Sequence, residues 1–443
     1  MRLLPVLALA LGAVCLVAAR PRPGRLVSPV ERRIVEAVDR HTPEALALLR
    51  RTVDLNSGTL NLAGVRRVGE ILAAEFKALG FATRWVDGSQ WGRAGHLVAT
   101  RPRRGQMPRV LLIGHLDTVF EPDSPFQRYE PLSDTTARGP GVIDMKGGDV
   151  VMLLALRALK EAGALDRLDV TAVLTGDEEK AGSPLELARR DLLAAAGSAD
   201  IAIGFEDGDG DPHHAVIARR GASGWVLTVK GEAAHSSQVF RPEIGSGAIY
   251  EAARILSAFR DSLSLEPYLT VNPGVLVGGT TATLDPDAGR GTAFGKNNVI
   301  AESTVVTGDL RTISLEQRDH AQAIMRRIVA ASPPHASASI TFEDGYPPLA
   351  PSDGNRRLLQ VYDRASRDLG LGPVEAVDPS RAGAADVSFT EGRVKMAIDG
   401  IGLRGEGGHT VEETADLAWL APQAKRAALM MARLGAAGVS RSR

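Results

Sequence analysis

The sequence predicts an α/β protein in which a mainly parallel sheet is interrupted by a smaller α+β unit. In the first half of the chain, three short apolar runs typical of strands buried on both faces alternate with helical patterns. From about residue 221 the pattern changes to strands of alternating character. The α/β pattern resumes after Ser332-Pro333-Pro334. We therefore expect one larger domain that is interrupted once.

The first half contains helices and buried strands in turn. Apolar spacing predicts an amphipathic helix over Pro29–Asn56 and another over Asn61–Leu79, which Gly80 ends. The buried elements expected after them are the strand Arg109–Gly114, the helix Met145–Ala162, the strand Asp169–Leu174, a helix near Pro184–Ala196 and the strand Ile201–Phe205. Alternation of this kind indicates helices on both faces of a parallel sheet.

The second half contains the insertion and the return to the larger domain. The inserted unit is expected to comprise the strand Gly224–Val229, the helix Ile244–Ser262, strands within Val299–Leu310 and the helix Leu315–Ala331. The return is expected to comprise a helix near Asn355–Leu369, the strand Lys395–Ile398 and the helix Leu417–Leu434. The predicted divisions are residues 27–220 and 334–443 for the larger domain and 221–333 for the insertion.

The N-terminus has the pattern of a secretory signal peptide over residues 1–19. Arg2 precedes an apolar run from Leu3 to Ala19, which is short for a membrane span and ends in small residues. Cleavage there would remove Cys15, the one cysteine, and leave a chain suited to an oxidising compartment. We expect a periplasmic or secreted protein; an uncleaved membrane anchor is the alternative.

Charge and cysteine content exclude several classes of protein. The 52 Lys and Arg residues balance 53 Asp and Glu residues, which argues against a nucleic-acid partner held by a basic field. One cysteine excludes a disulfide framework within the chain and any thiolate-based zinc or iron–sulfur site. A metal site in this chain must therefore use His, Asp and Glu side chains.

Acids and histidines follow the predicted strands of the larger domain. Singly, Asp144 could be a helix N-cap, and Asp177-Glu178-Glu179 a solvated turn. In open parallel sheets, however, ligands bind outside the carboxyl ends of the strands. We therefore expect one cluster at that edge, formed by His115, Asp144, Glu179, Glu206 and His409.

Two histidines and three carboxylates, one of them bridging, suit two divalent cations. This set favours zinc and also allows cobalt or manganese. Asp117 lies two residues after His115, on the same side of an extended backbone, and suits a partner that orients the imidazole. Glu178 is left as a free carboxylate beside the cluster and could act as a general base.

The chain resembles the di-zinc amidohydrolases that include glutamate carboxypeptidase, aminoacylase, acetylornithine deacetylase and succinyl-diaminopimelate desuccinylase. The resemblance covers roughly residues 40–435. Its motifs are Gly114–Val119, Gly139–Gly148, Thr175–Lys180, Ala199–Asp207, Gly231–Ser236 and Gly407–Thr410. The resemblance implies a catalytic domain interrupted by a lid or dimerisation domain.

The resemblance also implies roles for individual residues of the cluster. It makes Asp144 the bridging metal ligand, Glu178 the general base and Asp117 the partner of His115. The other implied metal ligands are His115, Glu179, Glu206 and His409. The peptide bond after Asp144 is expected to be cis.

The inserted domain is implied to contribute to the active site. His235 would stabilise the oxyanion, often in the active site of the partner subunit. Arg311 would bind the free carboxylate of the substrate, and Asn298 of the same lid would contact substrate. The backbone of Gly383, in the larger domain, would also contact substrate. The chain departs from its relatives at Ala382–Asp386, where many have Gly-Gly-Thr-Asp, so that pocket can differ. Asp207 also stands after Glu206, where glutamate carboxypeptidase types commonly have proline.

These features predict a secreted or periplasmic metallo-exopeptidase with two Zn²⁺ per chain. It would hydrolyse an amide bond next to a C-terminal carboxylate, in the manner of a glutamate carboxypeptidase. An N-acyl-amino-acid amidohydrolase or a dipeptidase is the alternative at the same site. The expected partners are a small peptide or N-acyl amino acid substrate and a second copy bound through the inserted domain. A serine hydrolase is disfavoured because Gly221-Ala222-Ser223-Gly224 does not fit Gly-x-Ser-x-Gly.

Overall fold

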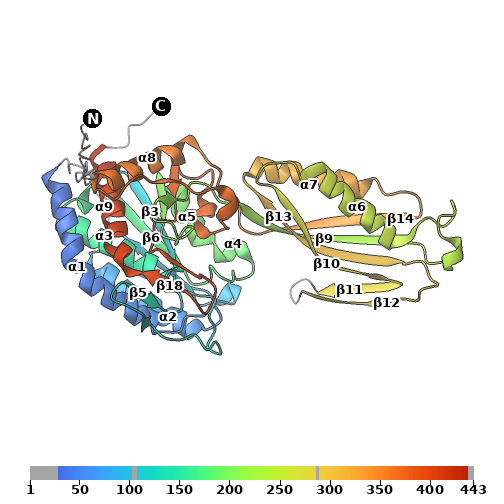
Figure 1. Cartoon of the computed structure of the whole chain (residues 1–443), viewed down its shortest axis with the longest axis horizontal. Helices are drawn as coiled ribbons and strands as arrows, with labels where there is room; N and C mark the ends of the chain where they lie inside the picture. The colour runs from blue at the N-terminus through green and yellow to red at the C-terminus, as the bar shows by residue number, and fades with distance from the viewer. Residues whose placement is uncertain (1–27, 102–106, 286–288, 438–443) are drawn as a thin grey trace, which may run out of the picture.

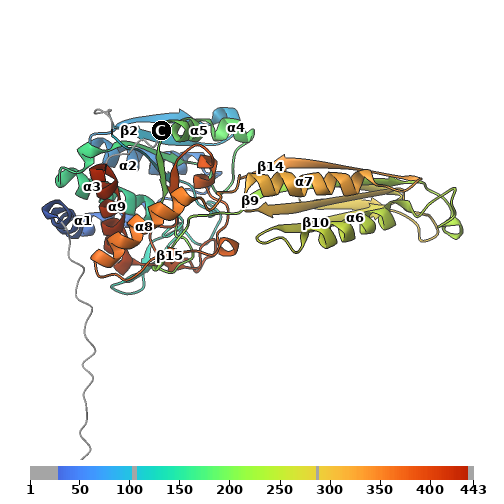
Figure 2. The same cartoon turned by 90° about the horizontal axis from the view of Figure 1, so that it is seen from above.

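The computed structural model describes residues 28–101, 107–285 and 289–437. The signal peptide expected over residues 1–19 lies outside this part of the chain, and so does Cys15. Within the described ranges, none of the helices combines the length and apolar character that crossing a membrane requires. Two units are visible, and the smaller one extends away from the larger and joins it at one end only (Figure 1 and Figure 2).

The larger unit is built from a six-stranded sheet and helices on both of its faces. Its main elements are α1 (Pro29–Val53), α2 (Leu62–Ala78), β1 (Ala82–Asp87), β2 (Gly95–Thr100), β3 (Arg109–His115), α3 (Lys146–Glu161), β6 (Asp169–Thr175), α4 (Leu185–Ala188), α5 (Arg190–Ser198), β7 (Ile201–Gly204), α8 (Asp353–Asp368), β16 (Met396–Ile398) and α9 (Leu420–Ala437). Helix α1 begins with a capping box in which Ser28 and Glu31 bond each other's backbone amides.

The strand order of the sheet is β1-β2-β6-β3-β7-β16. Strands β6, β3, β7 and β16 are parallel; at one edge β2 runs antiparallel to β6, and β1 runs antiparallel to β2. The predicted fold class, a mainly parallel sheet, is therefore confirmed. The sequence analysis did not identify β1, because only Val86 of its six residues is buried and no continuous apolar run marks it.

Alternate residues of the central strands enter two separate cores. Leu112 of β3 packs into the core shared with α1, α3 and α9, whereas Leu111 and Ile113 pack against Leu192 and Ala196 of α5. Burial on both faces explains why the strand sequences are continuously apolar. It also leaves the carboxyl ends of the strands as the place where polar side chains can gather.

The smaller unit has the βαββαβ order of a ferredoxin-like fold, with a hairpin inserted. Its elements are β9 (Gly221–Gly231), α6 (Gly247–Leu263), β10 (Thr270–Gly279), β11 (Thr281–Asp285), β12 (Arg290–Phe294), β13 (Ser303–Thr312), α7 (Leu315–Ala330) and β14 (Ala336–Asp344). The antiparallel sheet has the order β10-β13-β9-β14. Helices α6 and α7 cover one face, and the β11–β12 hairpin lies on the opposite side (Figure 1).

The end of the inserted unit differs from the boundary expected at residue 334. Strand β14 pairs with β9 along its whole length, from Ala336 opposite Gly231 to Asp344 opposite Ser223, so the insertion extends to Asp344. The Ser332-Pro333-Pro334 segment joins α7 to β14 and is a turn within the unit. The prediction took this turn for a linker because the alternating Ser and Thr residues of β14 have no apolar run.

Candidate metal centre

The carboxyl ends of the parallel strands bring the predicted residues together. His115 is the last residue of β3, Glu178 and Glu179 follow the end of β6, and Glu206 follows β7. Strand pairing sets these positions side by side, since His115 lies opposite Thr175 of β6. The imidazole Nε2 of His115 lies 3.0 Å from Asp144 Oδ1 and 3.7 Å from Glu206 Oε1.

Asp144 and His409 reach the same place from two loops. The Asp144–Met145 peptide bond immediately before α3 is cis, as the resemblance implied. His409 lies between the short strands β17 (Gly405–Glu406) and β18 (Thr414–Asp416), with a φ of 63°. Its Nε2 lies 2.8 Å from Asp144 Oδ2 and 3.1 Å from Glu179 Oε2.

The result is two groups of ligand atoms that share one carboxylate. His115, Asp144 and Glu206 form one group, and Asp144, Glu179 and His409 form the other; within each group the atoms lie within 4.8 Å of one another. Asp144 presents one oxygen to each histidine. This is the arrangement of a bridging carboxylate between two cations.

Asp117 ties His115 to the loop that carries Glu178. Its carboxylate accepts hydrogen bonds from the backbone amides of Glu178 at 3.0 Å and Glu179 at 3.2 Å, and from the Thr59 hydroxyl at 2.6 Å. Its Oδ1 also lies 3.5 Å from His115 Nδ1. Asp117 therefore lies outside both groups of ligand atoms and orients members of each.

Two buried acids that the sequence analysis did not single out hold the remaining loops. Glu413 is fully buried and accepts hydrogen bonds from the backbone amides of Gly141, Ile143 and Asp144 at 3.0, 2.9 and 3.3 Å. Asp399 accepts one from the amide of Glu206 at 3.2 Å. The only signal for Glu413 in the sequence is its position four residues after His409.

The electrostatics of the cluster call for positive charge. Hydrogen bonds that His409 donates to the Asp144 and Glu179 carboxylates raise the pKa of its imidazole to about 11. Burial raises the pKa of the Glu178 and Glu206 carboxyls well above their usual range, and nearby carboxylates add to the effect. So many buried acids are costly to ionise unless cations compensate them.

The residues fit two divalent cations. Each group offers one imidazole nitrogen and two carboxylates, a donor set that zinc accepts. Glu179 Oε1 is buried and has no hydrogen-bond partner among the residues described, as expected of an oxygen that awaits a ligand. Glu178 belongs to neither group and is left as a carboxylate beside them.

The four residues predicted to contact substrate or its oxyanion lie in three separate places. His235 and Asn298 are exposed and lie together, because the Ser236 amide bonds the Asn298 carbonyl at 2.9 Å. Arg311 lies at the other end of the inserted sheet, opposite Ala222, and pairs with Asp309 at 2.8 Å. Gly383 belongs to the larger unit, and its carbonyl accepts a hydrogen bond from Arg219.

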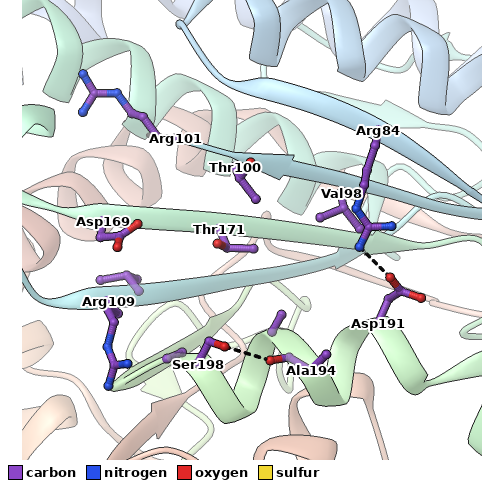
Figure 3. Close-up of a pocket in the computed structure, with 13 residues that line it drawn as sticks. Arg84, Val98, Thr100, Arg101, Arg109, Asp169, Thr171, Asp191, Ala194 and Ser198 are labelled. Carbon is purple, nitrogen blue, oxygen red and sulfur yellow. Dashed lines mark hydrogen bonds and ion pairs between the residues drawn. The ribbon is translucent and has the colours of Figure 1, made fainter. Parts of the chain in front are cut away.

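A separate hollow of about 380 Å³ lies at the opposite end of β3 and β6 (Figure 3). Arg109 and Asp169, the first residues of those strands, line it. Arg84 pairs with Asp191 in this hollow. None of the predicted site residues lines it, so the chemistry of the cluster does not extend there.

Comparisons with known proteins find similar sequences and similar folds among peptidases. Carboxypeptidase G2 of Pseudomonas sp. (strain RS-16) is 25% identical over 410 residues, which cover 91% of this chain and 92% of that protein. The structure of aminopeptidase PepT from Bacillus cereus matches with a TM-score of 0.68 at 19% identity, over 89% of this chain and 98% of that one.

A third match concerns the metal. The Bacillus subtilis YXEP protein, described as a dinuclear metal binding peptidase from the M20 family, matches with a TM-score of 0.61 at 15% identity, over 89% of this chain and 98% of that one. The model of peptidase family M20/M25/M40 matches residues 111–433, well over half of the chain. The chain therefore belongs to peptidase family M20/M25/M40 and is a metal-dependent hydrolase.

Proposed function

We propose that this hydrolase cleaves an amide bond next to a C-terminal carboxylate, in the manner of a glutamate carboxypeptidase, with two Zn²⁺ per chain. The observation that carries the proposal is the shared Asp144, which faces a histidine with each oxygen while Glu178 stands free beside it. The similarity to carboxypeptidase G2, which spans over nine-tenths of both chains, supports this choice of substrate class.

The ligands would divide between the two cations. His115 and Glu206 would hold one, Glu179 and His409 the other, and Asp144 would bridge them. Bound there, the cations would supply Lewis acidity that polarises the scissile carbonyl and lowers the pKa of a water molecule.

Glu178 is the proposed general base. Its backbone amide donates a hydrogen bond to the Asp117 carboxylate, which holds the loop in place, and burial raises the pKa of its carboxyl above the usual range. A raised pKa suits a group that first takes a proton and then returns it. We propose that it accepts a proton from the attacking water and delivers it to the leaving nitrogen. General acid–base catalysis of this kind contributes about 10²–10⁴-fold to the rate.

Arg311 is the proposed anchor for the substrate carboxylate. Its backbone lies opposite Ala222, near the point where the lid leaves the larger unit. A bidentate guanidinium–carboxylate pair would select substrates with a free C-terminus. The Arg311 guanidinium pairs with Asp309 at 2.8 Å. On substrate binding, it would have to leave Asp309 or contact both carboxylates.

His235 and Asn298 support a homodimer. Strand β9 has 11 residues and carries the chain about 33 Å from the junction before His235 is reached. At that end of the lid, His235 suits the active site of a second copy better than its own. Exposed apolar side chains on α6 and the edge strand β10, including Ile249, Tyr250 and Leu276, offer a surface for that copy.

A substrate panel tests the proposed specificity. It compares peptides ending in free glutamate with the same peptides amidated at the C-terminus, other dipeptides and N-acyl amino acids. Arg311→Ala should raise KM at least tenfold for free-carboxylate substrates, whereas Arg260→Ala, a control on α6 whose side chain is 72% exposed, should not. Equal activity of wild type and Arg311→Ala on every carboxylate substrate would refute the anchor. Preference for N-acyl amino acids would favour the deacylase alternative.

Localisation forms part of the proposal. A chain exported by the N-terminal segment would be recovered from the periplasm or medium without residues 1–19, as sequencing of its new N-terminus would reveal. Recovery of the uncleaved chain in the membrane fraction would favour the anchor instead.

A further inference from the structure

Tyr346 lies where the chain returns from the inserted unit to the larger one. It comes two residues after the end of β14. Its backbone carbonyl accepts a hydrogen bond from the amide of Ala222, at 2.8 Å, and Ala222 lies in the first strand of the inserted unit. The outgoing and returning segments of the chain are therefore joined at Tyr346. We call this junction of the two units the hinge; Figure 1 shows the two connecting segments.

The side chain of Tyr346 reaches the loop of the proposed general base. Its hydroxyl donates a hydrogen bond to the backbone carbonyl of Glu178 at 2.9 Å and accepts one from Arg189 Nη2 at 2.6 Å. The ring packs edge-on against Phe389, with ring centroids 5.0 Å apart. The hydroxyl thus connects the hinge to the backbone of Glu178.

Arg189 holds the same loop through Asp177, the residue before Glu178. It is fully buried, and its Nη1 and Nη2 donate to the side chain and the backbone carbonyl of Asp177 at 2.7 and 3.0 Å. Its Nε donates to Asp386 at 2.7 Å, and Asp386 in turn accepts from the Thr175 hydroxyl at 2.6 Å. All of these groups are paired, so the network has one well-defined geometry.

The loop is therefore held from two sides. Asp117 binds the amides of Glu178 and Glu179 on the side of the metal ligands. Tyr346 binds the carbonyl of Glu178 on the side of the hinge. Of these two contacts, only the one from Tyr346 is linked directly to the inserted unit, through Ala222.

We propose that Tyr346 is a positioning residue that couples the orientation of the lid to the placement of Glu178. A rotation of the inserted unit about its two connections displaces Tyr346 and, with it, the carbonyl of Glu178. Misplacement of a reacting group by about 1 Å can lower a rate about 10²-fold. Even a small displacement of Glu178 is therefore expected to change kcat measurably. The proposal rests on the role of Glu178 proposed above.

Tyr346→Phe tests the proposal, because it removes only the hydroxyl. Tyr362→Phe is the matched control: Tyr362 is also buried, and its hydroxyl donates to Gln423 at 3.1 Å, among residues that do not belong to the metal cluster. We expect Tyr346→Phe to lower kcat about tenfold, with KM within twofold and unchanged metal content. We also expect faster amide hydrogen exchange over residues 176–182, without substrate, in this variant alone.

The outcomes separate the two proposals. If Tyr346→Phe keeps the kcat of wild type and the exchange pattern of the control, the coupling is refuted. If it loses metal, or if KM rises as much as kcat falls, its role is structural and the coupling is likewise refuted. Glu178→Gln, assayed in parallel, tests the base alone: full activity there refutes the proposed mechanism, whereas an inactive Glu178→Gln with a fully active Tyr346→Phe refutes only the coupling.

Discussion

Glu413 holds the loop of the bridging Asp144 through three backbone hydrogen bonds, and Glu413→Gln weakens that grip without changing the side-chain shape. Oε1 accepts from the amides of Ile143 and Asp144, and Oε2 accepts from the amide of Gly141. A glutamine amide can keep the first two bonds by placing its oxygen at the Oε1 position. Its NH₂ group then faces the Gly141 amide, donor against donor.

The expected effect follows from that one mismatch. Glu413 is fully buried, so water cannot replace the lost acceptor. A buried polar group left without a partner costs about 1–3 kcal/mol, and we take about 2 kcal/mol for this site. If the loss is expressed as a displaced Asp144, metal affinity falls about 30-fold, since each 1.4 kcal/mol is tenfold. This lies within the 10–100-fold range typical of residues that orient metal ligands.

Competition between the protein and a chelator of known zinc affinity measures this change. Glu412→Gln is the control, because its side chain is 76% exposed and neighbours the same position in the sequence. We expect the control to bind zinc as wild type does and Glu413→Gln to bind it about 30-fold more weakly. Equal zinc affinity in the two variants would refute the view that Glu413 positions Asp144.

Two further predictions concern the proposed dimer and the loss of folding stability at acid pH. If His235 acts in the partner's site, subunit exchange between Glu178→Gln and His235→Ala proteins should restore about a quarter of wild-type activity, because half the dimers are mixed and each has one complete site; no recovery would contradict this. Arg109 lowers the pKa of Asp200 from 3.8 to about 2. The pair therefore stabilises the fold above pH 4, and this contribution, about 1 kcal/mol after solvent screening, is lost as pH falls towards 2. Melting of Asp200→Asn should lack that pH step.

The parallel sheet and the metal cluster were predictable because their signals are local. The central parallel strands are continuous apolar runs, and each ligand lies at or near a strand end or in a short Gly-rich motif, as His115 and His409 do. Topology then brings the ends together. The ligands could therefore be identified from their positions along the chain, without knowledge of side-chain contacts.

The supporting contacts were not predictable in the same way. Glu413 meets the Asp144 loop across about 270 residues of chain, and Tyr346 meets Glu178 across 168, so no periodicity or spacing marks either pair. The end of the inserted unit was predicted too early for a related reason. Strand β14 is defined by its pairing with β9, whereas its own residues are mostly small and half-exposed.

Metal stoichiometry tests the central claim, that Asp144 joins two cation sites, most directly. Elemental analysis of the purified, dialysed chain should give about two divalent ions per wild-type chain and at most one in Asp144→Ala. Chelation should abolish hydrolysis, and added zinc should restore it. A wild-type chain that is active without metal, or an Asp144→Ala chain that still holds two ions, would contradict the account.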